Sequence, residues 1–139
     1  MANGNSIRST LNFSILLIAV IAFEVGDAVT VVIKNDIWPF HTELTVHCKS
    51  KNDDLGFHTL KFGETYMFSF TPLVFPPTGN TLFFCSFTWP GRPYRHYLDV
   101  YDQTKDACGT CNWKISQTGG CKSDNQGPET CQDWKSIEI

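Results

Sequence analysis

The sequence lacks the local motifs that mark several common classes of enzyme. It contains no G-x-S-x-G elbow, P-loop, GxGxxG or HExxH, which are the patterns of serine hydrolases, nucleotide-binding proteins and zinc proteases. It also lacks an excess of either charge, because 11 Lys and Arg residues stand against 14 Asp and Glu, a net charge of −3. This balance argues against nucleic-acid binding and against strong adhesion to anionic lipid.

Long hydrophobic runs are lacking except at the start of the chain. The mainly apolar run from Leu11 to Phe23 follows Arg8 and is shorter than the roughly 20 residues that a membrane-spanning helix needs. A basic residue, a short apolar run and the small residues Gly26 and Ala28 are typical of a secretory signal peptide. We predict a signal peptide at 1–28, cleaved after Ala28, and one secreted, extracellular domain at 29–139 without membrane insertion. The alternative is a buried or membrane-anchoring N-terminal helix.

After residue 28 the sequence lacks the 3.6-residue periodicity of an amphipathic helix. It consists instead of short β-branched, aromatic or alternating segments, separated by turn clusters rich in Gly, Pro, Asn and Asp. The expected strands are VTVVIKN (29–35), ELTVHCKS (43–50), TYMFSF (65–70), TLFFCSFTW (81–89), HYLDVYD (96–102) and NWKIS (112–116). This order predicts an all-β fold, a small disulfide-stabilised antiparallel β-sandwich.

Three segments are expected to be irregular because they are polar or rich in turn-forming residues. KSKNDDLG at 49–56 is predicted to be an exposed connection that leaves the strand near Ser50, and PGRP at 90–93 a turn. The polar tail at 121–139 is predicted to be loop-like, with Cys121 and Cys131 tying it down.

The six cysteines all lie in the predicted mature chain, at Cys48, Cys85, Cys108, Cys111, Cys121 and Cys131. An even number in a small exported protein predicts up to three disulfides, among 15 possible pairings that the sequence leaves open. We expect Cys108 and Cys111, which form a CxxC, to pair with different partners. A redox pair or a zinc site is less favoured, because no helix pattern follows the CxxC and zinc requires thiolates in a reducing compartment.

Candidate catalytic and metal-binding groups are scattered. The four histidines, at 41, 47, 58 and 96, form no ligand motif, and we expect them to be exposed or capping. A His47–Cys48 dyad is disfavoured, because neighbours on a strand point to opposite faces. Asp53 and Asp54 are interpreted as part of a solvated turn. We therefore predict no catalytic residue, no metal and no cofactor.

Aromatic residues are abundant and should mostly fill the core. Trp38 and Trp89 each precede a turn at a strand end, so we expect both to be partly exposed. Exposed rings at such positions could anchor a protein partner.

Several blocks of the sequence resemble one family. LTVHCKSKNDDLGFHTL, GETYMFSF, TLFFCSFTW, LDVYDQTKD, CGTCNWKISQTGGC and the final CQDW are similar, in this order, to the plant self-incompatibility S1 family, the S-protein homologues. The resemblance covers nearly the whole predicted mature chain. It implies a small secreted β-sandwich with intramolecular disulfides. For the founding members it also implies a pistil protein that a pollen membrane protein recognises.

The resemblance implies a non-enzymatic signalling ligand that a cell-surface protein receptor recognises. We expect a monomer, with charged loops that tune partner choice. The candidate recognition residues are Lys51, Asp53, Asp54, Arg92 and Arg95. Two other functions stay open: a small secreted hydrolase or carbohydrate-active protein, and a secreted defence protein that acts on foreign membranes.

Overall fold

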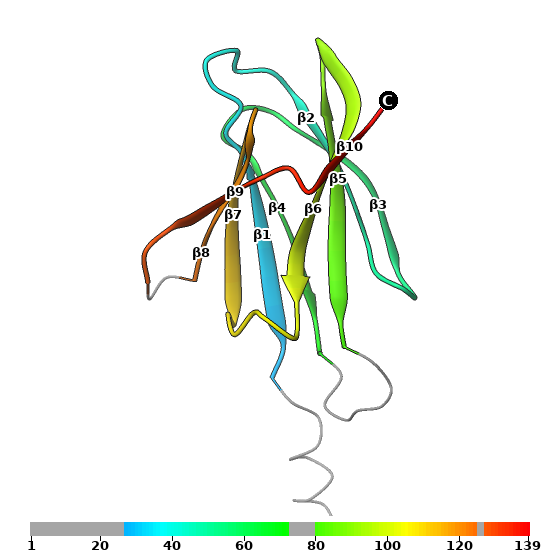
Figure 1. Ribbon diagram of the computed structural model, residues 1–139, viewed down its shortest axis with the longest axis vertical. Helices are drawn as coiled ribbons and strands as arrows, with labels where there is room; N and C mark the ends of the chain where they lie inside the picture. The colour runs from blue at the N-terminus through cyan, green and yellow to red at the C-terminus, as the bar shows by residue number, and fades with distance from the viewer. Residues whose placement is uncertain (1–26, 73–79, 125–126) are drawn as a thin grey trace, which may run out of the picture.

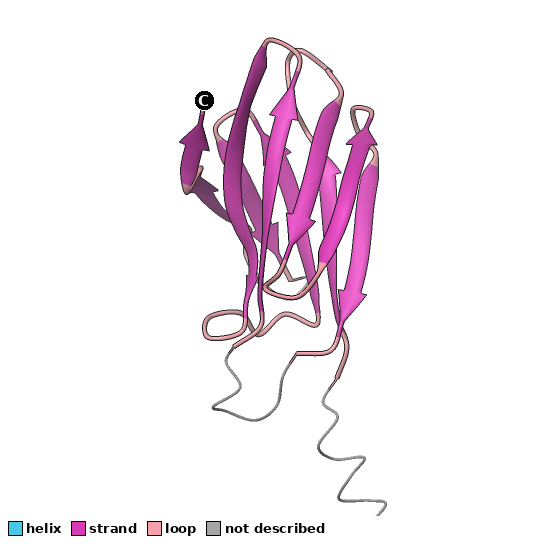
Figure 2. Cartoon of the chain, turned by 90° about the vertical axis from the view of Figure 1, so that its right-hand side faces the viewer, coloured by secondary structure: helices cyan, strands magenta, loops and turns pink. Residues whose placement is uncertain are grey.

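The computed structural model describes residues 27–72, 80–124 and 127–139. Strands, turns and loops make up these residues (Figure 2), and no helix among them is long and apolar enough to cross a membrane. The predicted signal peptide, residues 1–28, lies outside the described residues except for Asp27 and Ala28.

Two sheets of five strands each face one another (Figures 1 and 2). The first sheet has the order β4 (Thr65–Phe70), β1 (Val29–Asn35), β7 (Thr110–Ser116), β8 (Gly119–Ser123) and β9 (Thr130–Asp133). The second has the order β10 (Ser136–Glu138), β6 (Arg92–Asp102), β5 (Leu82–Trp89), β2 (Leu44–Lys49) and β3 (Asp54–Leu60). The predicted β-sandwich is confirmed. One strand pair differs from the antiparallel expectation, because β1 runs parallel to β7 with Thr30 opposite Thr110.

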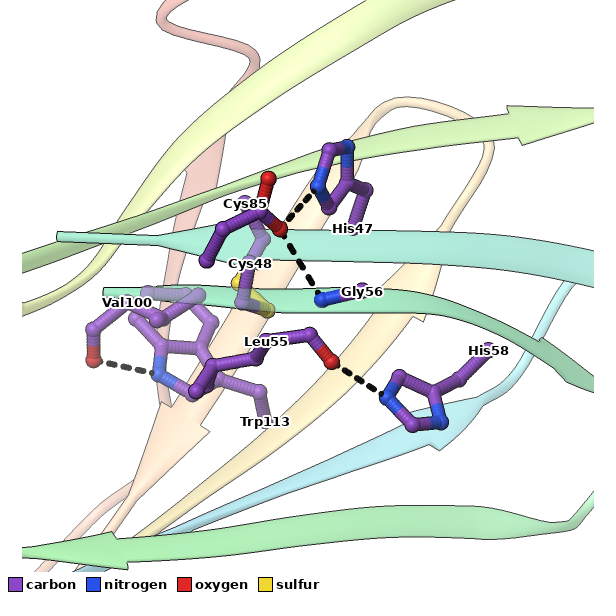
Figure 3. The surroundings of a disulfide bond; sticks show 9 residues. His47, Cys48, Leu55, Gly56, His58, Cys85, Val100 and Trp113 are labelled. Carbon is purple, nitrogen blue, oxygen red and sulfur yellow. Dashed lines mark hydrogen bonds and ion pairs between the residues drawn. A yellow bond between two sulfur atoms is a disulfide. The ribbon is translucent and has the colours of Figure 1, made fainter.

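The core lies between the two sheets and follows the alternation of the sequence. In β2, Leu44, Val46 and Cys48 are fully buried, whereas the residues between them face outward. Trp113 of β7 is buried against the second sheet and donates its indole N–H to the carbonyl of Val100, over 2.9 Å (Figure 3). This bond satisfies the one polar atom of the largest core side chain, which would otherwise lose its hydration on burial.

Aromatic rings close the side of the sandwich formed by the edge strands β3 and β4. Tyr66 and Phe68 of β4 share one face, as the alternation predicts, and both pack against the core. The His58 ring of β3 stacks on Tyr66 at 3.9 Å between centroids, and its Nε2–H donates to the carbonyl of Leu55. His58 thus joins the two sheets across their open edges.

The tail is ordered differently from the sequence-based expectation. It forms β8, β9 and β10 instead of a loop, and it crosses from the first sheet to the second (Figure 1). Trp134 lies at the crossing, donates its indole N–H to the carbonyl of Gln117 over 2.8 Å, and packs on the rings of Phe87 and Trp89. The Cys121–Cys131 disulfide holds the start of this segment. Backbone pairing, a half-buried indole and one disulfide therefore order a segment with little apolar alternation.

Two strand boundaries also differ from expectation. β3 begins at Asp54, inside the predicted connection at 49–56, and β6 begins at Arg92, inside the predicted PGRP turn. In both places the partner strand supplies the hydrogen bonds, with Lys49 opposite Asp54 and Trp89 opposite Arg92. Cross-strand pairing extends the strands through residues that favour turns on their own.

Candidate functional site

All six cysteines are paired, as Cys48–Cys85, Cys108–Cys111 and Cys121–Cys131. The expectation that the two cysteines of the CxxC have different partners was wrong. Residues 108–111 form the entry into β7, so the chain turns there and brings Cys108 back to Cys111. The other two bridges join residues directly opposite one another, between β2 and β5 and between β8 and β9. The first of these bridges lies between the strands in Figure 3.

Redox and metal chemistry receive no support from the surroundings of the cysteines. The strand β7 follows the CxxC, whereas redox CxxC pairs depend on a helix N-terminus to lower the thiol pKa. Among the residues that the structure describes, one group of three possible metal-ligand atoms is close together, Cys121, Glu129 and Cys131. Both of its sulfurs are joined in a disulfide, so neither is a thiolate.

The predicted recognition residues do not form one surface. β2 and β5 are antiparallel, with Lys49 opposite Phe84 and Thr45 opposite Thr88. Lys51 and Asp53 follow the Lys49 end, whereas Arg92 lies in the hairpin beyond Thr88, at the opposite end of the sandwich. Arg95 is on β6 rather than in a loop, and its guanidinium lies 3.0 Å from the Glu138 carboxylate of β10. Arg92 and Arg95 were therefore assigned wrongly to a loop.

Asp54 is held by two donors at a break in the β2–β3 register. Gly56 adopts φ +76°, which favours glycine, and the register shifts between His47 and Lys49. The Asp54 carboxylate then accepts from the Gly56 N–H at 2.9 Å and from His47 Nε2 at 2.6 Å (Figure 3). These two hydrogen bonds, in that order, lower the pKa of Asp54 from its ordinary value, and desolvation of the carboxylate opposes them.

His47 lies on the outer face, as the strand alternation predicts, and points away from the Cys48–Cys85 disulfide (Figure 3). A His47–Cys48 dyad is excluded, because Cys48 is buried in a disulfide. His96 contradicts the expectation of exposed or capping histidines: it is only 3% exposed and donates to the Phe87 carbonyl. The expectation that Trp89 is partly exposed was also wrong: it is only 5% exposed, because its ring stacks on the buried His96 ring at 4.4 Å between centroids.

Three further aspartates, Asp53, Asp99 and Asp102, also have structural partners. Asp102 accepts from the hydroxyl and from the backbone N–H of Thr104, and these hydrogen bonds, in that order, lower the pKa of Asp102. Asp99 accepts from Lys135 over 2.6 Å, and Asp53 lies in an exposed turn with Ser50. Turn capping and exposed ion pairs account for these contacts.

Aromatic side chains are exposed to solvent at one end of the sandwich. The β1–β2 loop carries Trp38 and Phe40, whose side chains are 67% and 69% exposed. The ring of His41, from the same loop, lies 4.2 Å from that of Phe62 in the β3–β4 turn, and Phe62 is itself exposed. The aromatic tip, defined as Trp38, Phe40, His41 and Phe62, presents apolar rings of a kind that often anchors protein interfaces. Both connections lie at the upper end in Figure 1.

The loop that carries the aromatic tip is firmly held. Ile37 is fully buried beneath it, and the His41 N–H donates to the Ile37 carbonyl. The buried Asn35 amide donates to the carbonyls of Thr42 and Leu60, while its oxygen accepts from the Ile37 N–H. The Gln117 side chain donates to the Trp38 carbonyl over 3.0 Å. These bonds fix the backbone on which the exposed rings stand.

The sequence pointed to one member of this cluster. Trp38 was predicted to be exposed at a strand end, and it is. Phe40, His41 and Phe62 were missed, because the β1–β2 loop and the β3–β4 turn lie far apart in the sequence. The signal available was the aromatic density of WPFH at 38–41, which is unusual for a loop that faces solvent.

Comparisons with known proteins agree with this fold. The family model of the plant self-incompatibility protein S1 matches residues 30–134. S-protein homolog 2 of Arabidopsis thaliana is 40% identical over 114 residues, which cover 76% of this chain and 67% of that protein. S-protein homolog 5 of the same plant is 40% identical over 94 residues, 66% of this chain and 68% of that protein.

A solved structure shares the fold, with a TM-score of 0.58 over 80% of this chain and 97% of that one, at 21% identity. It is that of an SPH (self-incompatibility protein homologue) protein, from a widespread family described as small, highly stable, secreted proteins from plants. The family match over residues 30–134, the identity to the S-protein homologues and the shared sandwich lead to one conclusion: this chain belongs to the plant self-incompatibility protein S1 family.

Proposed function

We propose that the protein is a secreted, non-enzymatic signalling ligand, and that a cell-surface protein receptor recognises it through the aromatic tip. The single observation that carries the proposal is the set of exposed rings on a loop whose backbone is fixed from below. A fixed loop loses little conformational entropy on binding, so more of the contact energy contributes to affinity. Trp and other aromatic residues are enriched among interface hot spots.

Secretion is supported by three independent features. The N-terminal residues are typical of a signal peptide, the related SPH protein is described as secreted, and three disulfides favour an oxidising compartment. Expression of the full chain in plant suspension cells tests this step. We expect protein in the medium that begins at Val29 by mass spectrometry; protein retained inside the cells would contradict it.

Recognition is tested with the oxidised protein from that medium, fluorescently labelled and applied to pollen and to vegetative protoplasts. A protein receptor requires binding that saturates and that disappears when the cells are treated with protease beforehand. Preference for pollen would support a role in pollen–pistil recognition, whereas preference for vegetative cells would support a ligand in another process. Absence of saturable binding to both would contradict the receptor proposal.

The aromatic tip is tested with Trp38→Ala and Phe40→Ala. The matched control is Met67→Ala, because Met67 is an exposed apolar residue on the outer face of β4. Each tip variant should weaken cell binding by about thirtyfold or more, since hot-spot truncation typically costs at least about 2 kcal/mol. The control should bind like the unmodified protein. If all three variants bind equally well, the aromatic tip is not part of the receptor interface.

A further inference from the structure

The outer face of the second sheet, on the side away from the core, contains a hollow of about 250 Å³. Its floor is formed by short hydroxyl side chains, and longer aromatic and cationic side chains surround them. The floor residues are Thr45, Ser86 and Thr88, and the surrounding residues are His47, Lys49, Phe57, Phe84, Arg95 and Tyr97.

The register of four strands explains why this face is hollow. Residues that pair across neighbouring strands form a row of side chains on this face. In one row, Phe57 of β3 is opposite His47 of β2, His47 is opposite Ser86 of β5, and Ser86 is opposite Tyr97 of β6. Side chains on adjacent strands are close enough to touch in such rows. A serine between a histidine and a tyrosine therefore leaves a gap, and the adjacent Thr45–Thr88 pair extends it.

Aromatic rings stand on the sides of the hollow. Phe57 is 72% exposed, and its ring leans on that of His47 at 4.0 Å between centroids. Phe84 and Tyr97 stand near one another on the other side, at 6.5 Å. The faces of aromatic rings carry partial negative charge, so they attract the polarised C–H groups of a sugar ring. Hydroxyl groups on the floor can both donate and accept hydrogen bonds, as sugar hydroxyls require.

The lining contains cations and no carboxylate. Lys49 and Arg95 line the hollow, whereas their acidic neighbours, Asp54 at 3.9 Å and Glu138 at 3.0 Å, are not part of the lining. All four side chains are about half exposed, between 44% and 59%, and ion pairs that face solvent are weak and easily rearranged. Both cations can thus turn to an anionic ligand, and Arg95 offers the paired donors that suit a carboxylate.

We propose that this hollow binds an oligosaccharide that bears carboxylate groups, with one sugar unit held between the Phe57 and Tyr97 sides. The size supports a single unit of a longer chain, because enclosed pockets for drug-sized ligands occupy about 300–1,000 Å³. The polar floor disfavours an apolar ligand, since its hydroxyls would lose their hydration without replacement. This site goes beyond the receptor proposal and shares no residue with the aromatic tip, so either can fail without the other.

The test uses oxidised protein from expression of the full chain, titrated with a linear trigalacturonate by calorimetry and by amide NMR. The matched neutral probe is the fully methyl-esterified trimer, and polyglutamate is the anionic probe without sugar rings. The variants are Phe57→Ala and Lys49→Gln. Their controls are Met67→Ala and Lys114→Gln, since Met67 and Lys114 are exposed on the first sheet.

We expect trigalacturonate to shift the amides of Thr45, Ser86 and Thr88 and to bind about tenfold more tightly than either other probe. Each hollow variant should weaken binding by about tenfold, as expected for loss of one charge-assisted bond or one stacking ring, whereas the controls should not. The proposal is overturned by equal binding of the esterified trimer or polyglutamate, by an equal effect of Lys114→Gln, by shifts elsewhere, or by no binding of trigalacturonate.

Discussion

The side-chain amide of Asn35 donates a hydrogen bond to the backbone carbonyl of Leu60 over 3.0 Å, and so joins the last residue of β1 to the last residue of β3 in the other sheet. The backbone of Asn35 also pairs with the β3–β4 turn, donating to the Glu64 carbonyl and accepting from the Gly63 N–H. A single buried residue therefore fastens the sheets together at the end that carries the aromatic tip.

Replacing Asn35 with alanine should lower the free energy of unfolding by about 2–3 kcal/mol, because the buried carbonyl of Leu60 and the partly buried carbonyl of Thr42 lose their donor. Chemical denaturation measures the loss. Hydrogen exchange at the Ile37 and His41 amides should also become faster. Asn52→Ala, at an exposed asparagine of the β2–β3 loop, is the control and should change stability by less than about 0.5 kcal/mol. Equal effects of the two variants would contradict the fastening role.

The three disulfides should stabilise the protein unequally. The cysteines of Cys48–Cys85 are 37 residues apart, those of Cys121–Cys131 are 10 apart and those of Cys108–Cys111 are 3 apart. The loss of unfolded-chain entropy grows with loop length, which gives about 4 kcal/mol for the first bridge, about 3 for the second and less than about 2 for the third. Double Cys→Ala variants, compared by denaturation under oxidising conditions, should follow this order, and the reverse order would count against an entropic origin.

A methyl group at Gly119 should loosen the tail. Gly119 adopts φ +152°, and a Cβ there would meet the carbonyl oxygen of Gln132 and lie 2.9 Å from the Asp133 Cα on β9. Gly119→Ala should therefore destabilise the protein by more than about 2 kcal/mol and speed proteolysis after β8. Gly109→Ala is the matched control, since nothing lies within 4 Å of its Cβ position. If both variants are cleaved at the same rate, β9 does not depend on this close approach.

Acid should weaken the fold partly through Asp54. Its pKa is lower in the folded protein because of Gly56 and His47, so the ionised carboxylate stabilises the fold above about pH 4, and this contribution is lost as the pH falls through the lowered pKa. Asp54→Asn should be less stable than the unmodified protein at pH 6 and should lose less stability between about pH 4 and pH 2.5. Thermal unfolding across this range measures both. Asp53→Asn should retain the original pH dependence, and identical profiles for the two variants would refute the assignment.

Alternating strands were predictable from the sequence because one face of each is buried. Leu44, Val46 and Cys48 occupy every second position of β2, and the structure buries all three. The same reasoning placed His47 on the outer face. Burial of apolar side chains thus determines which side chains of each strand point to the core, whichever sheet the strand joins.

The features that the sequence did not predict depend on contacts between residues that local sequence does not reveal. β9 and β10 are exposed throughout, so no apolar alternation marked them, and pairing with β8 and β6 gives them their form. His96 is buried because the Trp89 ring of the same hairpin stacks on it and the Trp134 ring, distant in sequence, packs against it. The aromatic tip likewise required Asn35 to bring two separate connections together.

The parallel pairing of β1 with β7 has a consequence for the timing of folding. β1 is the earliest strand among the described residues, yet it occupies an inner place in the first sheet, and its register with β7 places Thr30 opposite Thr110. Until the ribosome has made β7, one edge of β1 has no native partner, so the sheet is completed only when most of the chain has emerged. Such distant pairings slow folding and leave an unpaired strand edge open to mispairing. Until β7 has been made, the free edge of β1 is therefore open to wrong pairing with strands of other chains.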